Sequence, residues 1–147
     1  HFETNKAKIY ADMDAIKLGV ILDNLLSNAV KFTPDGGSVR LSLFYREETG
    51  LLDICVSDTG SGIPQQDIPY IFQRFFQSPH SGNKEGTGIG LYLVKTYTEL
   101  HGGHINGVTS NEGKGTSIGL NIPVIAVEKE EIPATTGEKA VGIVACS

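Results

Sequence analysis

Apolar side chains recur at helical spacing near the start of the chain. Between about residues 14 and 32, an apolar residue returns every three or four positions, which places these residues on one face of an α-helix. This stripe consists of Leu18, Leu22, Leu25, Ala29 and Phe32. Pro34 and the glycines after it prevent the helix from continuing. The pattern therefore predicts one long amphipathic helix over about 14–32.

Strand patterns follow this helix. Residues 38–46 mostly alternate apolar and polar side chains, which predicts a strand with one buried face, and residues 51–57 are apolar enough for a central strand. Two further strands are predicted over about 104–110 and 115–122, joined by a tight turn, and a weak short strand is expected over 6–11. Because neighbouring strands are joined by tight turns, much of the pairing is expected to be antiparallel.

A second helix is predicted over about 89–101. Its apolar side chains fall on one side, and they are Leu91, Val94, Tyr97 and Leu100. Short helical pieces are expected over 67–76. Helices interspersed among largely antiparallel strands predict an α/β (α+β) fold, in which a mixed sheet of about five strands and a layer of helices form a two-layer sandwich.

Composition narrows the classes of function. The net charge is −5, so the overall balance gives no support to nucleic-acid binding. No apolar run approaches the ~20 residues of a membrane helix, so no direct membrane contact is expected. The polar first residues are not those of a signal peptide. Cys55 and Cys146 lie far apart in the sequence, which favours a reducing compartment and a buried Cys55 thiol.

The composition changes near residue 124. All the predicted helices and strands lie before this point, whereas residues 126–139 are rich in Glu, Lys, Pro, Thr and Gly. We therefore predict one domain over 1–124 and a linker or tail over 125–147, of the kind that leads to another domain. Because the first residue is His1, the chain is expected to be a piece of a longer protein.

Three polar side chains lie beside the apolar stripe of the first predicted helix. At about 100° per residue, Asn24, Asn28 and Lys31 share one face. Amide oxygens suit a hard cation such as Mg²⁺, and a lysine can offset phosphate charge. Two solvated asparagines and a surface lysine have the same spacing. From this helix alone, the solvated alternative is favoured.

The segment 58–62 ends a predicted strand with an acidic residue and two glycines. The Asp58 carboxylate can accept a hydrogen bond from an exocyclic amino group such as that of adenine, and Gly60 and Gly62 allow close approach of the backbone. The alternative is a tight turn in which Asp58 hydrogen-bonds its own backbone. Taken alone, this segment favours the turn.

The glycine-rich segment 86–91 opens the second predicted helix. Free N–H groups at a helix N-terminus form an anion site. The segment is not a Walker A loop, because no Gly-Lys-Ser/Thr follows, and its glycine spacing is not that of a Rossmann loop. The segment 113–116 alone predicts a hairpin turn. Each of these signals is weak by itself.

Taken in order, five segments resemble the N, G1, F, G2 and G3 boxes of the bacterial sensor histidine kinases. Residues 24–34, Asn-Leu-Leu-Ser-Asn-Ala-Val-Lys-Phe-Thr-Pro, closely match the N box, and residues 71–76, Ile-Phe-Gln-Arg-Phe-Phe, match the F box. The resemblance covers about residues 5–124. The five segments are Asn24–Pro34, Asp58–Pro64, Phe72–Gln77, Gly86–Leu91 and Gly113–Thr116.

The resemblance implies the Bergerat fold, with a mixed sheet backed by three helices on one face, and ATP and Mg²⁺ as ligands. Asn28 would be the main Mg²⁺ ligand with Asn24 beside it, and Lys31 would contact phosphate. Arg74 is a weaker candidate for a phosphate contact. These four are the candidate catalytic residues. The glycine-rich backbone facing the phosphates would comprise Gly86, Thr87, Gly88, Ile89, Gly90 and Leu91.

The resemblance also implies how the base is held. Phe32 would lie along the adenine, Asp58 would accept from its amino group, and residues 77–86 would form the ATP lid. The remaining residues around the base would be Gly60, Gly62, Ile63, Gly115 and Thr116.

The reaction implied is transfer of the ATP γ-phosphoryl group to a histidine on a dimerisation domain, which precedes this domain in the family. The histidines of this chain are interpreted as surface or capping residues: His1, His80, His101 and His104. The implied partners are that dimerisation domain and a downstream response regulator or fused receiver domain. The implied location is cytoplasmic, in a parent protein anchored in the bacterial inner membrane.

Three alternatives remain. An ATPase of the gyrase, chaperone and mismatch-repair type would carry a glutamate as general base at the position of Asn24, and an amide cannot take a proton at neutral pH. An anti-sigma-factor-type serine kinase shares the sandwich, but the N and F boxes argue against it. A degenerate binding module is disfavoured by the intact Asn28, Asp58 and glycine segments.

Overall fold

The computed structural model describes residues 1–6, 8–79, 86–124 and 140–144. The elements, in chain order, are β1 (Phe2–Thr4), β2 (Lys8–Asp12), α1 (Ala15–Phe32), β3 (Val39–Arg46), β4 (Leu51–Asp58), the 3₁₀ helix η1 (Ile68–Tyr70), α2 (Gly90–Leu100), β5 (His104–Asn111), β6 (Gly115–Pro123) and β7 (Ala140–Val144).

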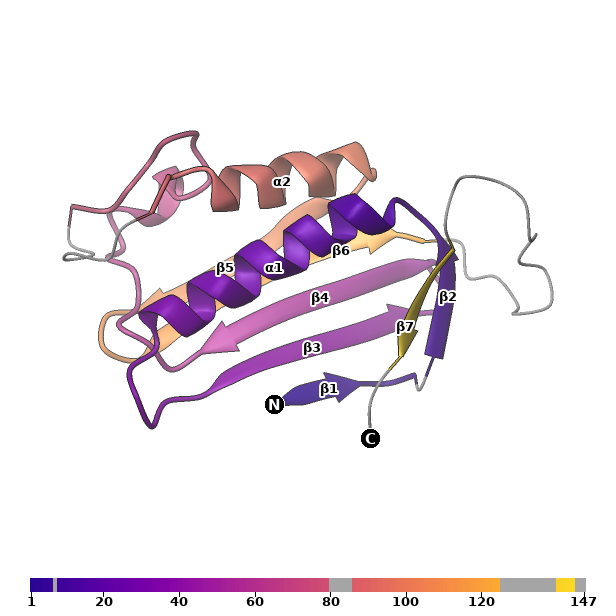
Figure 1. Ribbon diagram of the computed structural model, residues 1–147, viewed down its shortest axis with the longest axis horizontal. Coiled ribbons are helices and arrows are strands. Elements are labelled where there is room, and N and C mark those ends of the chain that lie inside the picture. The colour runs from indigo at the N-terminus through magenta and orange to yellow at the C-terminus, as the bar shows by residue number, and fades with distance from the viewer. Residues whose placement is uncertain (7, 80–85, 125–139, 145–147) are drawn as a thin grey trace.

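Five strands form one mixed sheet in the order β1-β3-β4-β6-β5. β1 pairs with β3 in parallel, and the other neighbouring strands are antiparallel. Both α-helices cover the same face of this sheet (Figure 1). The predicted two-layer α/β sandwich and the central position of β4 are thus confirmed.

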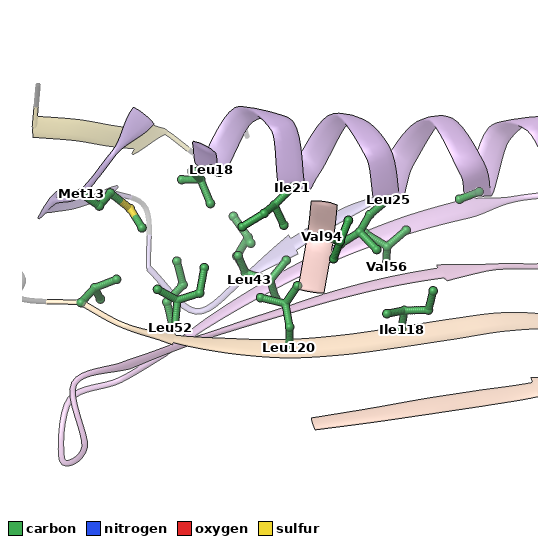
Figure 2. Packing of buried hydrophobic residues seen from close by; sticks show 14 residues of the cluster. Met13, Leu18, Ile21, Leu25, Leu43, Leu52, Val56, Val94, Ile118 and Leu120 are labelled. Carbon is green, nitrogen blue, oxygen red and sulfur yellow. The ribbon is translucent and has the colours of Figure 1, made fainter. Parts of the chain in front are cut away.

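The core lies between the helices and the sheet. Its fully buried side chains come from α1, from alternate positions of β4 and β6, and from α2, and they interlock in one layer (Figure 2). The largest of these are Ile21, Leu52, Ile54, Leu120, Ile122 and Val94. A single continuous core therefore holds both helices on the sheet.

Helix α1 begins and ends close to its predicted bounds. The Asp14 carboxylate accepts the backbone N–H groups of Ile16 and Lys17, which caps the N-terminus. Its buried residues are Leu18, Ile21, Leu25 and Ala29. Leu22 and Phe32 are only partly buried, so the stripe that faces the sheet is displaced slightly from the predicted one.

Helix α2 differs from its prediction at the C-terminal end. Val94 and Thr98 are buried, whereas Leu100 is 66% exposed, so the prediction that Leu100 lies on the apolar side is wrong. Leu100 lies two residues beyond Thr98, which turns its side chain by about 200° around the helix. Thr98 can be buried because its hydroxyl donates to Val94 O at 2.7 Å.

Several short elements were not predicted as such. β1 was not predicted at all, and the expected strand over 6–11 is the shorter β2. The range predicted as a linker or tail contains β7, which pairs with β2 in a separate two-stranded sheet. Two α-helices and the 3₁₀ helix η1 occupy the described part of the chain, where three helices were expected.

Cys55 lies on β4, on the side of the strand away from the buried Ile54 and Val56. It is half-buried rather than fully buried, because its sulfur lies on this less covered face, 3.3 Å from Ser117 Oγ. None of the described helices is both long and apolar enough to cross a membrane.

Four element ends meet at one end of the sheet. These are the C-terminal ends of α1 and β4, the start of α2, and the turn between β5 and β6 (Figure 1). Ser61, just after β4, joins two of them to its own segment: its N–H donates to Phe32 O at 3.1 Å, and its carbonyl accepts from Gly113 N at 2.7 Å. Residues far apart in sequence are thereby held together here.

Replacing Ile21 by alanine tests how much the core depends on α1. Ile21 is 0% exposed, so we expect the free energy of unfolding to fall by about 2–5 kcal/mol, since the truncation leaves a cavity. Ile16 is the matched control, because it lies on the same helix and is 81% exposed. Urea unfolding should show almost no change for Ile16→Ala. Equal losses in the two variants would contradict the observed packing.

Candidate functional site

Two adjoining cavities open where these element ends meet. The larger has a volume of about 200 Å³ and the smaller about 170 Å³. Part of the wall is common to both and consists of Asn28, Phe32, Ile63, Ser78 and Leu91. Because the cavities share a wall, one elongated ligand can extend from the first into the second.

The larger cavity is mainly apolar and carries an acidic group. The Asp58 carboxylate, at the end of β4, lines it together with Leu25, Ala29, Val56 and Ile118. Such a cavity suits a flat heteroaromatic ring that presents an amino group.

The two oxygens of the Asp58 carboxylate have different surroundings. Oδ1 accepts the N–H groups of Gly60 at 2.8 Å and Thr116 at 3.2 Å. Within the described ranges, nothing donates to Oδ2. The predicted turn contact of Asp58 with its own backbone is therefore present, and the same carboxylate still has an acceptor for a ligand.

Glycines allow the walls of the larger cavity to approach each other closely. A Cβ on Gly62 would lie 2.1 Å from Asn111 O, and a Cβ on Gly115 would lie 1.9 Å from Asp58 O. Both glycines also have positive φ, at 73° and 109°. The segment after β4 and the turn between β5 and β6 can pack this closely only without side chains at these two positions.

The smaller cavity carries a positive charge. Lys31 lines it, with Nζ 5.2 Å from the centroid of the Phe32 ring. Residues 86–88 and Gly90 also line it, and a Cβ on Gly86 would lie 3.0 Å from Lys31 Nζ. Within the part of the chain that the structure describes, no side chain caps the N-terminus of α2. An ammonium group and uncapped backbone N–H groups together suit an anionic group such as phosphate.

Asn28 and Asn24 lie one turn apart on α1 but differ in their contacts. Asn28 is half-buried and lines both cavities, and none of the described residues hydrogen-bonds to its side-chain amide. Asn24 lines neither cavity. Its Nδ2 donates to Val20 O at 2.8 Å, and its Oδ1 would lie 2.7 Å from a Cβ on Gly90. The Asn28 amide is thus available to a ligand, whereas the Asn24 amide contacts the protein.

The donor atoms of the site limit the kind of metal that fits. Over the described part of the chain, no group of three or more His, Cys, Asp or Glu side chains is placed to hold a metal ion. The Asn28 oxygen is a neutral ligand that suits a hard cation sharing phosphate oxygens and water. The residues present fit Mg²⁺ only as part of a metal–phosphate complex.

The segment that matches the F box supports the glycine-rich segment through its backbone. Phe75 N–H donates to Gly88 O at 2.8 Å, and Gln77 Nε2 donates to Gly86 O at 2.7 Å. Phe75 has a φ of 65°, which is uncommon for a residue with a side chain. A Cβ on Gly88 would lie 2.6 Å from the Phe75 carbonyl carbon, so this contact requires glycine.

Most residues predicted from the sequence to form the site line the two cavities. Gly60 and Gly115 instead contact Asp58 through the backbone. Arg74 is exposed, with its guanidinium 4.7 Å from the centroid of the Phe75 ring, and its phosphate contact stays a prediction. The predicted residues that line neither cavity are Asn24, Gly60, Arg74, Ile89 and Gly115.

Some lining residues were not predicted. Glu112 lies in the predicted turn beside the last glycine segment. Ser61 and Pro64 lie within the predicted segment 58–64, and Ser78 lies within the predicted lid, but none of these residues was singled out as a site residue. The cavity-lining residues missed in this way include Ser61, Pro64, Ser78 and Glu112.

Two of the histidines that were interpreted as surface or capping residues contact other residues of the chain. His101 Nδ1 lies 2.7 Å from Tyr97 O at the end of α2. His104 Nε2 lies 3.4 Å from Asn121 Nδ2 on the neighbouring strand. His80 and most of the predicted lid fall outside the described residues. Neither His101 nor His104 lines a cavity.

Comparison with curated proteins identifies relatives. A family model described as histidine kinase-, DNA gyrase B-, and HSP90-like ATPase matches residues 13–126. Sensor histidine kinase WalK of Bacillus subtilis is 41% identical over 117 residues, which are 78% of this chain and 19% of WalK. Autoinducer 2 sensor kinase/phosphatase LuxQ of Vibrio vulnificus is 42% identical over 131 residues, which are 86% of this chain and 15% of LuxQ. The chain thus spans less than a fifth of these relatives.

Solved structures agree with these relatives. The mycobacterial sensor histidine kinase MprB superposes with a TM-score of 0.74 at 31% identity, covering 86% of this chain and 85% of that one. Full-length ShkA in complex with AMPPNP gives a TM-score of 0.72 at 28% identity, covering 86% of this chain and 25% of ShkA.

The fold and the two cavities define a nucleotide-binding α/β sandwich. The chain belongs to the family of histidine kinase-, DNA gyrase B- and HSP90-like ATPases, and within it the chain corresponds to the catalytic domain of the sensor histidine kinases. The resemblance of the five sequence segments is therefore confirmed.

Replacing Gly62 by alanine tests the close approach that shapes the larger cavity. Gly113 is the matched control, because φ is 73° at both positions and nothing lies within 4 Å of a Cβ on Gly113. Gly113→Ala should cost only about 1–2 kcal/mol, for the left-handed conformation. Gly62→Ala should cost clearly more in urea unfolding, because backbone must also move. Equal costs would show that the contact with Asn111 is not tight.

Proposed function

We propose that this domain binds ATP together with Mg²⁺ and transfers the γ-phosphoryl group to a histidine on a dimerisation domain outside this chain. One observation supports transfer to a protein rather than to water. The smaller cavity, which suits phosphate, has no carboxylate or imidazole among the described residues that line it. The carboxylates of the site, Asp58 and Glu112, line the larger cavity instead.

In this proposal the larger cavity holds the adenine. Asp58 Oδ2 accepts from the exocyclic amino group, while Oδ1 keeps its contacts with Gly60 and Thr116. The apolar walls from α1, β4 and β6 exclude water from the ring faces. Because the amino group meets an acceptor in an apolar setting, the site favours adenine over a base with an oxo group there.

The smaller cavity holds the phosphates in the same proposal. The Lys31 ammonium offsets their negative charge, and the N-terminus of α2 directs N–H groups toward them. Bound Mg²⁺ would neutralise further phosphate charge, with Asn28 as its protein ligand. Asn24 lies beside the start of α2, where its Oδ1 would be 2.7 Å from a Cβ on Gly90, and in this proposal it does not act as a base.

The relatives, which are sensor kinases several times longer than this chain, support a proposal about the wider setting. We propose that the parent protein presents this domain in the cytoplasm, is anchored in the bacterial inner membrane, and passes the phosphoryl group to a response regulator or a fused receiver domain. Fractionation of cells and phosphotransfer from the full-length protein test these points. A periplasmic domain would contradict the first.

Substitution of Asn28 by alanine tests the metal assignment. We expect Mg²⁺ to strengthen ATP binding to the wild type. In Asn28→Ala, the factor by which Mg²⁺ raises ATP affinity should fall about tenfold, which corresponds to a loss of about 1.4 kcal/mol. Binding in EDTA should not change. Asn106 is a matched control, because it is exposed and lines neither cavity. Titration calorimetry measures ATP affinity for the wild type, for Asn28→Ala and for Asn106→Ala. If Mg²⁺ strengthens ATP binding to Asn28→Ala as much as to the wild type, the assignment is overturned.

None of the described residues that line the smaller cavity is a base, and this predicts how the isolated chain behaves. With ATP labelled at the γ-phosphate, the 147-residue chain should bind the nucleotide, retain no label on its own residues, and release inorganic phosphate no faster than a buffer blank. Steady phosphate release would instead favour the ATPase alternative. Label held stably by the chain would favour an acceptor within it.

A further inference from the structure

Ser110, near the end of β5, makes several contacts at the base end of the site. It is 3% exposed and lines neither cavity. Its hydroxyl accepts the N–H of Ile63 at 2.7 Å, donates to Gly115 O at 3.1 Å, and lies 2.8 Å from Thr116 Oγ1. Three groups from two separate segments therefore meet at one buried hydroxyl.

The hydrogen-bonding capacity of this hydroxyl is fully used. A serine hydroxyl has one proton and two lone pairs. The Gly115 carbonyl can only accept and the Ile63 N–H can only donate, so the remaining lone pair of Ser110 accepts the Thr116 hydroxyl proton. No capacity is left for a ligand. Any effect of Ser110 on a ligand must act through its neighbours.

Those neighbours stand on two sides of the larger cavity. Ile63 lines both cavities from the segment after β4. Thr116 lines the larger cavity from β6, and its N–H donates to Asp58 Oδ1. Hydrogen bonds to Ser110 thus connect the side of the cavity that carries Ile63 with the side that carries Asp58 and Thr116. A further hydrogen bond connects the segment after β4 with β5, since Gln65 Nε2 donates to Ser110 O at 2.5 Å.

We propose that Ser110 is a positioning residue for base recognition. Its hydroxyl sets Thr116 and Ile63 relative to Asp58, so that the larger cavity has the width and the acceptor position that select an amino-bearing purine. The inference rests on the proposed function, because it assumes that this cavity holds the base. It assigns a role to a residue that does not touch the nucleotide.

The experiment compares ATP and GTP binding to the full chain and to Ser110→Ala by titration calorimetry. We expect Ser110→Ala to bind ATP about tenfold more weakly, the effect of losing about 1.4 kcal/mol, and the preference for ATP over GTP to shrink by a similar factor. The strengthening of ATP binding by Mg²⁺ should not change, because the Ser110 hydroxyl contacts Ile63, Gly115 and Thr116 and not the proposed Mg²⁺ ligand Asn28.

Ser117→Ala is the matched control. Ser117 is half-buried and, like Ser110, has a hydrogen-bonded hydroxyl, with its Oγ 2.8 Å from Ser57 Oγ, and it lines neither cavity. A merely structural role for Ser110 predicts a lower melting temperature in both variants and an unchanged ratio of ATP to GTP affinity. The proposal predicts a changed ratio in Ser110→Ala alone, and its recovery in Ser110→Thr, which keeps the hydroxyl.

Gln65→Ala provides a second variant if Ser110→Ala does not fold. Gln65 is exposed, so its truncation leaves no core cavity. Gln65→Ala should lower the preference for ATP over GTP about threefold, because it removes the hydrogen bond from Gln65 Nε2 to Ser110 O. If folded Ser110→Ala has the wild-type ratio of ATP to GTP affinity, or if Gln65→Ala has it when that variant is the one tested, the inference is overturned and the proposed function is not. A wild-type chain that binds no ATP overturns the proposed function and the inference with it.

Discussion

The packing of α1 against β3 and β4 is the contact on which the rest of the structure depends. Leu25 and Ala29 are buried against the sheet, and side chains on a helix project at fixed angles. Burying these two residues therefore leaves Asn28 at the border of the buried face, where it lines both cavities. The same constraint brings Lys31 into the smaller cavity. The core thus orients Asn28 and Lys31 toward the cavities.

The site separates its charges along its length. Asp58 and Glu112 line the larger cavity, whereas Lys31 lines the smaller one. A ligand with an amino-bearing apolar ring at one end and an anionic group at the other matches this separation. The glycines contribute mainly by permitting contact: Gly62 and Gly115 let two backbone segments approach to distances that a side chain would prevent.

The long elements could be predicted because their signals are local. Helix α1 and strands β3, β4, β5 and β6 carry clear periodicities, and the observed bounds lie within a few residues of the expected ones. Strand β1 has three residues, too few to show a period, and it forms through parallel pairing with β3. Strand β7 pairs with β2 across more than a hundred positions, which no local pattern can reveal. Leu100 was misassigned because α2 packs through Val94 and Thr98.

The sequence by itself determined the helices and main strands, and the order of five segments determined the family. It also placed Asn24 and Asn28 on one face of α1, because helical geometry is local. Only the tertiary structure distinguished them: α2 packs beside Asn24, while Asn28 lines both cavities. Ser110 shows the same limit. The partners of its hydroxyl are Ile63, forty-seven positions away, and Gly115 and Thr116 at the start of β6, so its role exists only once β5, β6 and the segment after β4 have come together.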